Sequence, residues 1–116
     1  MTRALLPLLR RGSGKRLVQI TSLMGSMGDN GSGGSYAYRM SKAALNMANV
    51  NLGHEFGHEG FVALTVHPGW VQTRMGGGAA PLRAEESVAG ILRLTAEAGA
   101  DHNGGFYRWD GRPLPF

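Results

Sequence analysis

Hydrophobic residues along this chain follow two patterns, one typical of helices and one typical of strands, and the two take turns along the sequence. Three stretches repeat apolar residues every three or four positions, as helices do, at residues 1–11, 36–57 and 84–98. Shorter stretches rich in apolar, β-branched or aromatic residues predict strands at residues 16–21, 61–66 and 104–110. The predicted order is therefore α-β-α-β-α-β, with a glycine-rich loop at residues 22–35 and a second loop at residues 67–81.

Strands that alternate with helices of this length require crossover connections and a parallel sheet. The run FVALTV at residues 61–66 is apolar almost throughout, which is typical of a strand covered on both faces. We therefore expect a single α/β domain over residues 1–116. Three strands are few for a parallel sheet, so the outer edge of the strand at residues 16–21 is expected to lack a partner.

The predicted helices differ in how many apolar stripes they carry. The first and third helices carry one stripe each and are expected to bury Ala4, Leu5, Leu8, Leu9, Val88, Ile91 and Leu92. The middle helix carries two stripes, and the sheet can cover only one of them. Met40, Met47 and Val50 belong to the second stripe. They predict a homo-oligomer that forms through the Tyr36 to Gly57 helix.

Composition excludes several classes of protein. With 42% hydrophobic and 17% charged residues, the chain is expected to be globular. It has no cysteine, which excludes disulfides and thiolate metal sites, and no apolar run is long enough to cross a membrane.

The net charge is +4, but the apolar run LLPLL interrupts the basic residues near the N-terminus. We therefore expect no nucleic-acid partner, no membrane contact and a cytoplasmic location.

One group of residues has the spacing of a catalytic set. Ser22 follows the first predicted strand, and ligands of open α/β sheets bind outside the carboxyl ends of the strands. Tyr38 and Lys42 lie one helical turn apart, so they can face the same volume. A nearby ammonium favours the phenolate form of a tyrosine, which makes it a usable proton donor and acceptor. Ser26, in the same loop, is the alternative serine.

The phrases around these residues resemble the short-chain dehydrogenase/reductase family, in its carbonyl-reductase-like, C-factor-like branch. The matching phrases are RLVQITS, YRMSKAALNM, HPGWVQT and GGFYRWDGRPLPF. The resemblance covers essentially the whole chain and implies the C-terminal part of a Rossmann-type doubly wound parallel sheet. It further implies NAD(P)-dependent interconversion of a small carbonyl compound and its alcohol.

The resemblance also implies a role for each matching residue. Ser22 would hydrogen-bond the substrate carbonyl, Tyr38 would exchange a proton with it, and Lys42 would bind the nicotinamide ribose and assist Tyr38. The implied site for NAD or NADP consists of Tyr38, Lys42, Pro68, Gly69, Val71 and Thr73.

Part of the family pattern has no counterpart in this sequence. In proteins of the family, the glycine-rich nucleotide fingerprint and the residue that selects NAD or NADP lie in the N-terminal half of the chain. The run GSGK at residues 12–15 is not a complete phosphate-binding loop, and the glycines at residues 31–33 are followed by Tyr36 where a third glycine is needed. The chain also opens inside a helix pattern, so we expect a segment of a longer protein that is weakly active or inactive alone.

A competing motif lies in the middle helix. His54, Glu55 and His58 match H-E-x-x-H, in which two histidines bind zinc and the glutamate activates water. A third ligand would be required, and Glu85 or Glu86 is a candidate. Because the helix is predicted to end near the second histidine, we expect no metal. A zinc metallopeptidase and a non-catalytic, dimerising remnant remain the alternatives to an oxidoreductase.

Overall fold

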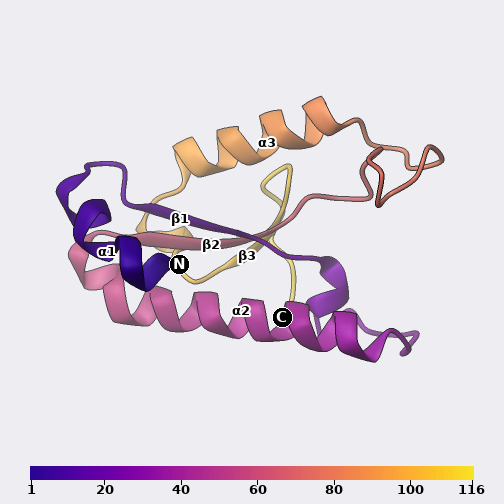
Figure 1. The fold of residues 1–116 in the computed structure, drawn as a ribbon, viewed down its shortest axis with the longest axis horizontal. Helices are drawn as coiled ribbons and strands as arrows, with labels where there is room; N and C mark the ends of the chain where they lie inside the picture. Colours follow the sequence, from indigo (N-terminus) through magenta and orange to yellow (C-terminus); the bar gives the residue numbers. More distant parts are fainter.

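Three parallel strands form the centre of the molecule, and helices cover both faces of the sheet (Figure 1). The strands are β1 (Arg16–Ile20), β2 (Val62–His67) and β3 (Phe106–Arg108), in the order β1-β2-β3. The computed structural model describes all 116 residues. The parallel sheet inferred from the hydrophobic pattern is confirmed, and each predicted strand has a counterpart.

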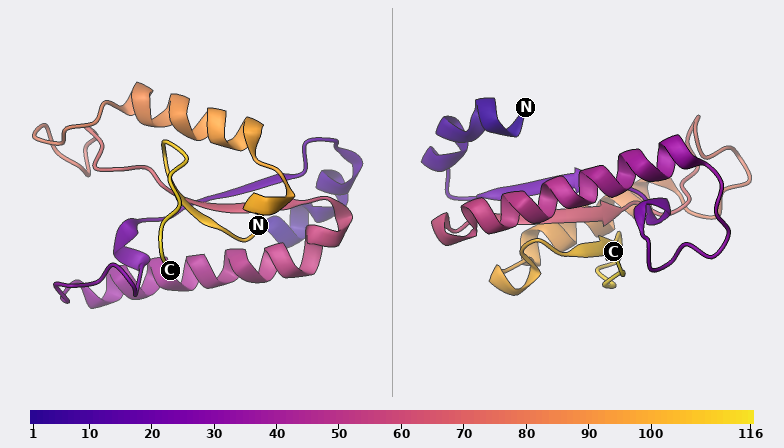
Figure 2. Two further views of the ribbon diagram at one scale, coloured as in Figure 1. Left: turned by 180° about the vertical axis from the view of Figure 1, so that it is seen from behind. Right: turned by 90° about the horizontal axis from the view of Figure 1, so that it is seen from below.

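The three predicted helices also form. They are α1 (Thr2–Arg11), α2 (Tyr36–Phe56) and α3 (Ala84–Glu97), with single 3-10 turns η1 (Leu23–Gly25), η2 (Gly57–Glu59) and η3 (Ala100–His102). α1 and α2 lie on one face of the sheet, and α3 lies on the other (Figures 1 and 2). This is the doubly wound arrangement expected for the fold class. None of the helices combines the length and apolar composition that crossing a bilayer requires.

The core consists of two apolar layers that share the central strand. Alternate residues of β2 point to opposite faces of the sheet, so the strand is buried from Val62 to Val66. The layer under α1 and α2 contains Leu6, Leu17, Phe61 and Ala63. The layer under α3 contains Val62, Leu64, Val66, Leu94 and Ala98.

The two edges of the sheet differ. The chain's own C-terminal segment covers β3, because the Arg108 N–H donates to the carbonyl of Arg112 at 2.8 Å and the Leu114 N–H donates to Phe106 at 2.9 Å. The ring of Phe116 stacks on Phe106 with the ring centroids 5.7 Å apart. β1 has β2 as its only neighbour in the sheet. Its outer edge is bare, as the sequence predicts.

The predicted apolar stripes of α1 and α3 are buried only in part. On α3, Val88 and Leu92 are 52% and 64% exposed, while Ser87, Gly90 and Leu94 are buried. On α1, Leu5 and Leu8 are exposed, and Leu6 is the buried leucine. Leu9 and Ile91, from the same two stripes, do pack against the core.

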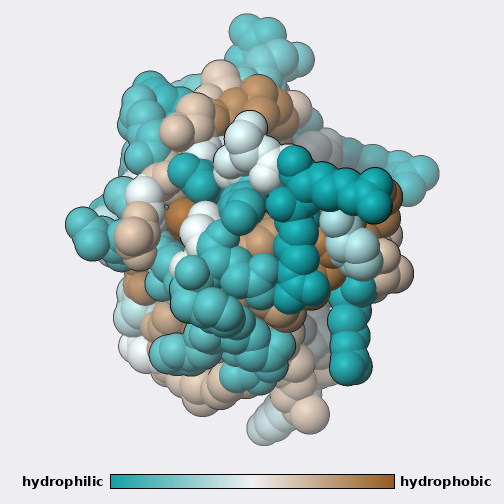
Figure 3. Space-filling view, turned by 90° about the vertical axis from the view of Figure 1, so that its left-hand side faces the viewer, coloured by the Kyte–Doolittle hydropathy of each residue, from teal (hydrophilic) through white to brown (hydrophobic).

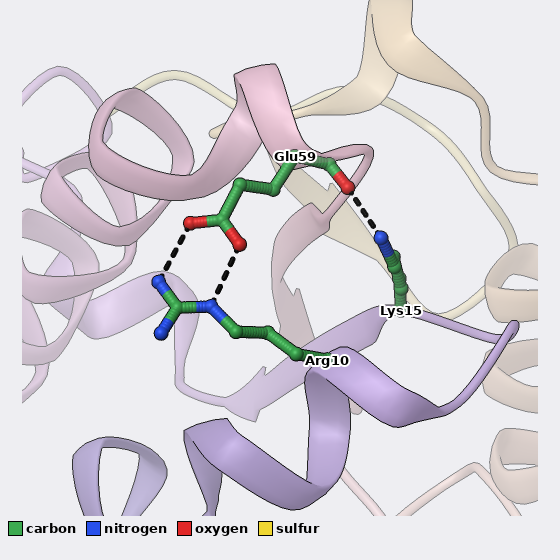
Figure 4. Close-up of polar contacts among 3 residues, drawn as sticks. All are labelled: Arg10, Lys15 and Glu59. Atoms are coloured by element: carbon green, nitrogen blue, oxygen red, sulfur yellow. Dashed lines mark hydrogen bonds and ion pairs between the residues drawn. The ribbon is translucent and has the colours of Figure 1, made fainter.

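A network of charged residues fastens α1 to the end of α2 (Figure 4). The guanidinium of Arg10 donates two hydrogen bonds of 2.7 Å to the carboxylate of Glu59 and lies 5.8 Å from the ring centroid of Phe56. Lys15 donates to the Glu59 carbonyl at 2.6 Å. The hydrogen bond from Arg10 lowers the pKa of Glu59. Seen from this end, the surface is mostly hydrophilic (Figure 3).

Replacing Glu59 should loosen α1 in a pH-dependent way. Because its pKa is lowered in the folded protein, the stabilisation by ionised Glu59 is present above the ordinary value of 4.5 and is lost as the pH falls below it. Glu59→Gln should therefore lower the thermal midpoint slightly at pH 7, and this difference should shrink as the pH falls below 4.5. Glu55→Gln, at an exposed position of the same segment, is the control. Equal midpoints of Glu59→Gln and the wild type at pH 7 would contradict this account.

Candidate active site

A cleft of about 790 Å³ opens at the carboxyl ends of the strands. The end of β1, the first turn of α2, the loop after β2 and one side of α3 line it. These elements meet at the right-hand side of Figure 1. Most of the lining is apolar, with a few hydroxyl groups and one imidazole. A mostly apolar cavity with a few placed polar groups is the usual form of a small-molecule site.

Ser22 lines this cleft at the point where β1 turns into η1. Its side chain is buried, and its Oγ accepts a hydrogen bond from the Met24 N–H at 3.1 Å. The hydroxyl hydrogen therefore remains available to donate. Ser26 is more deeply buried, its Oγ accepts from the Asp29 N–H at 3.0 Å, and it is not among the residues that line the cleft.

Tyr38 and Lys42 lie on the first turns of α2. Tyr38 lines the cleft and is 40% exposed. Lys42 does not line the cleft, but its Nζ lies 5.7 Å from the centroid of the Tyr38 ring. The same Nζ makes a long hydrogen bond of 3.5 Å to the carbonyl of Ile20. The predicted pairing of the two side chains on one side of the helix is therefore present.

A buried polar cluster holds the end of β1 against α2. The Thr21 hydroxyl donates to Oδ1 of Asn46 at 2.8 Å, and the Asn46 amide makes a long contact of 3.5 Å with the carbonyl of Gly25. Gly25 packs so closely on α2 that a Cβ there would lie 2.8 Å from the backbone carbon and Cβ of Lys42. These contacts fix Ser22 and Lys42 relative to each other.

The loop after β2 forms the opposite wall. Pro68, Gly69, Val71 and Thr73, the residues that the resemblance assigns to a cofactor site, all line the cleft. A parallel bridge between Val71 and Leu82 closes the loop at its base. The Thr73 Oγ1 accepts a hydrogen bond from the Gly76 N–H at 3.1 Å.

Two polar residues of the cleft, His67 and Ser87, were not singled out from the sequence. His67 ends β2, and its Nδ1 is buried without a hydrogen-bond partner. Burial lowers the pKa of His67, the charge of Arg108 lowers it further, and Asp29 offsets part of the effect. Ser87 donates to the Pro68 carbonyl at 2.7 Å and so ties α3 to the loop, while Leu92 forms the outer apolar rim. The phrase HPGW placed His67 and Pro68 together, but nothing in it marked the histidine as a cleft residue.

The H-E-x-x-H residues lie away from this cleft. His54 and Glu55 are exposed on the last turn of α2, and His58 falls in η2, after the α-helix has ended. Glu85 and Glu86, considered as a third ligand, begin α3 on the opposite face of the sheet. No three residues of the types that bind metals lie close enough together to share an ion.

The fold and the position of the cleft define the class of the protein. A doubly wound parallel sheet with a site outside the carboxyl ends of its strands is an α/β domain of the Rossmann type. The family model described as short chain dehydrogenase matches residues 1–83. The chain belongs to the short-chain dehydrogenase family of oxidoreductases.

Curated and solved relatives agree with this assignment. The chain is 48% identical over 116 residues to C-signal of Myxococcus xanthus, covering all of this chain and 70% of that protein. It is 38% identical over 112 residues to 1-hydroxy-2-glutathionyl-2-methyl-3-butene dehydrogenase of Rhodococcus sp. (strain AD45), covering 93% of this chain and 49% of that protein.

Two solved structures are similar over 99% of this chain and 51% of their own length. They are the carbonyl reductase Sniffer of D. melanogaster, with a TM-score of 0.93 and 36% identity, and an NADPH-bound carbonyl reductase from chicken fatty liver, with a TM-score of 0.90 and 30% identity. The chain thus spans about half the length of the dehydrogenase and of both carbonyl reductases.

Adding a methyl group at Gly25 should disturb the packing of the site. Gly25→Ala places its Cβ against the backbone of Lys42, which cannot yield as a flexible side chain would. Overpacking of this kind costs about 1–3 kcal/mol. Gly31→Ala is the matched control, since no atom lies within 4 Å of its Cβ position, and its effect should stay within about 0.5 kcal/mol. Urea unfolding of both variants measures the difference, and equal stabilities would show that η1 moves freely against α2.

Proposed function

We propose that this chain provides the catalytic half of an NAD(P)-dependent reductase or dehydrogenase acting on a small carbonyl compound or alcohol. The observation that supports this function best is the shared cleft of Ser22, Tyr38 and the loop at residues 68–73, with Lys42 beside Tyr38. The carbonyl reductases among the solved relatives have the same fold over this length. The zinc alternative has no comparable support, because its residues lie outside the cleft and lack a third ligand.

The roles of the side chains follow from their hydrogen-bonding capacity. Ser22 uses its oxygen to accept from Met24, so its hydroxyl hydrogen is free to bind and orient a substrate carbonyl oxygen. Tyr38 donates its phenolic proton to that oxygen as the carbonyl is reduced, and takes a proton back in the reverse direction. The ammonium of Lys42, on the same side of the helix, stabilises the phenolate that Tyr38 becomes.

The residues of the cleft fit one end of a nicotinamide cofactor. When bound, the nicotinamide ring supplies or accepts the hydride. Gly69 has φ +86° and lets the backbone turn at the cleft wall, and Lys42 has donors to spare for a ribose hydroxyl. For the pyrophosphate and adenosine, we find no complete dinucleotide fingerprint among these 116 residues: the glycines at residues 31–33 precede α2, but Tyr36 stands where the third glycine is needed.

The exposed stripe of α2 supports a homo-oligomer. Met40 and Met47 are 67% and 58% exposed, while Val50 of the same predicted stripe is half-buried. Methionines adapt their shape to irregular surfaces, which suits them to an interface between copies. We therefore retain association through α2 as part of the proposal, together with a cytoplasmic location.

A second candidate function is a non-catalytic one. It is favoured by the relative named C-signal, whose name describes a signal and not a reaction, and of which the chain spans 70%. In that case no reaction would take place in the cleft. The chimera experiment described below separates the candidates.

The 116-residue chain alone should bind NAD and NADP weakly. Its available contacts reach only the nicotinamide end, and they must offset the whole cost of association, which is several kcal/mol. We expect a dissociation constant in the millimolar range or weaker and no reductase activity. Calorimetric titration of the chain with each dinucleotide measures the dissociation constant. A micromolar constant would show that the cofactor site lies elsewhere on the chain or is more complete than the cleft indicates.

Catalysis by Tyr38 can be tested in a chimera in which residues 1–116 replace the matching half of the Sniffer carbonyl reductase. We expect the chimera to reduce carbonyl compounds with a nicotinamide cofactor. Tyr38→Phe should lower kcat by about 10²–10⁴-fold, because the ring remains but the transferable proton does not, and should leave dinucleotide affinity nearly unchanged.

Tyr36→Phe is the matched control, since Tyr36 is exposed one half-turn earlier and does not line the cleft. It should retain full turnover. Wild-type rates in the Tyr38→Phe chimera would remove Tyr38 from the mechanism. A folded chimera that binds dinucleotide but reduces no carbonyl compound would favour the non-catalytic candidate.

A further inference from the structure

His67 borders the cleft with a ring nitrogen that the fold does not use. Besides Tyr38 it is the only titratable side chain of the lining, which contains no carboxylate, ammonium or guanidinium group. Its Nδ1 is buried and makes no hydrogen bond. A buried polar atom without a partner costs free energy, so its presence needs a reason. No side-chain hydrogen bond within the fold supplies that reason.

The sheet places His67 next to Ser22 and on the face that carries Tyr38. The Thr21 N–H donates to the Val66 carbonyl at 2.9 Å, so His67 lies one strand across from the end of β1, at the strand spacing of about 4.8 Å. Val66 points into the layer under α3, so the next residue, His67, points toward α2. A substrate carbonyl held by Ser22 and Tyr38 therefore has its neighbouring atoms close to the imidazole.

The surroundings of His67 fix its backbone and its charge. Its carbonyl accepts a hydrogen bond from the Trp109 N–H at 2.9 Å, and it lies in register with Arg108 of β3. Burial lowers the pKa of His67 below its ordinary value of 6.5, the charge of Arg108 lowers it further, and Asp29 offsets part of this. The ring is therefore neutral at pH 7 and has one N–H donor and one acceptor nitrogen.

The burial of Nδ1 selects one of the two neutral forms of the ring. A buried N–H without a partner is rarer in proteins than a buried acceptor without one, so the proton belongs on Nε2. Nε2 also has no partner within the chain, but it is not sealed off as Nδ1 is. His67 therefore presents one N–H donor to a cleft whose lining is mostly apolar.

We propose that His67 determines the substrate specificity of this site by donating a hydrogen bond from Nε2 to a second oxygen of the substrate, close to the reacting carbonyl group. The inference rests on the proposed function. The substrate is uncharged, because no charged side chain lines the cleft, and its remaining groups are apolar, to match Met24, Trp70 and Met75. The substrate class is thus a ketone with an apolar group on one side and an oxygen acceptor on the other.

Nitrogen NMR of the 116-residue chain tests the donor without any catalysis. At pH 7 the ring of His67, identified by the signals that His67→Phe removes, should carry its proton on Nε2. Adding 2-methoxy-1-phenylethanone, which has an ether oxygen near its carbonyl group, should shift the Nε2 signal. The isostere 1-phenylbutan-1-one, which has a methylene group in place of that oxygen, should shift it less. A proton on Nδ1, or equal shifts with both ketones, would overturn the proposal.

Kinetics of the chimera that carries residues 1–116 test the specificity. The ratio of kcat/KM for the methoxy ketone to that for its isostere should be about tenfold lower in His67→Phe, because one hydrogen bond is lost. His67→Gln keeps an N–H donor and should retain part of the ratio. His54→Phe is the matched control, since His54 is exposed and lies outside the cleft, and it should retain all of it. An unchanged ratio in His67→Phe would contradict the assignment.

A purely structural histidine predicts a different result. Because Nδ1 of His67 has no partner, His67→Phe breaks no side-chain hydrogen bond of the fold and should not lower the urea midpoint of the chain. A structural role would lower this midpoint and change the rates of both ketones equally, which would overturn the proposal. Should the larger phenylalanine ring prevent folding, His67→Leu removes the donor with a smaller side chain, and the same ratio decides.

Failure of this inference and failure of the proposed function give different results. A chimera that reduces neither ketone counts against the proposed function, and the nitrogen NMR of the chain then decides the role of His67 by itself. Reduction of both ketones at a ratio that does not depend on residue 67 overturns the specificity role and leaves the proposed function in place.

Discussion

The burial of β2 on both faces and along both edges is the constraint on which the rest of the structure depends. Its residues from Val62 to Val66 alternate between the two apolar layers, so a single strand organises the packing of α1 and α2 on one side and α3 on the other. Burying an apolar side chain of this kind contributes about 1.5–3 kcal/mol. Because β1 and β3 pair only with β2, the positions of Ser22, His67 and the closing C-terminal segment are all set relative to this strand.

The interface between α2 and the sheet is built on small and polar residues. Asn46, Asn49 and Gly53 are the buried residues of this helix. A Cβ at Gly53 would lie 3.1 Å from Cα of Gly104, so the helix approaches the neighbouring backbone closely. Asn46 is satisfied by Thr21, but both polar atoms of the Asn49 amide are buried without partners, which costs about 1–3 kcal/mol. The close approach of α2 to the sheet is thus obtained at some expense of stability.

The sequence predicted the order and type of all six elements, because each carries a hydrophobic period long enough to be recognised. It also placed Ser22, Tyr38 and Lys42 in one region, since strand ends and helical turns have fixed geometry. The buried sides of α1 and α3 were predicted only in part: Leu9 and Ile91 pack against the core, but Leu5, Val88 and Leu92 are exposed, because apolar spacing marks a stripe and not which part of it the sheet covers. His67 and Ser87 were missed because their burial depends on how the loop after β2 folds back onto α3.

The candidate site is open to solvent. Ile20 and Leu92, which both line the cleft, are exposed, and Tyr38 itself is 40% exposed. Water at such a site weakens the electrostatic interactions on which proton transfer depends. Any group that covers the cleft and excludes this water would strengthen those interactions. By linkage, a ligand that binds the covered cleft more tightly must stabilise the cover to the same extent. The affinity of this site is therefore a property of the chain together with whatever covers the cleft.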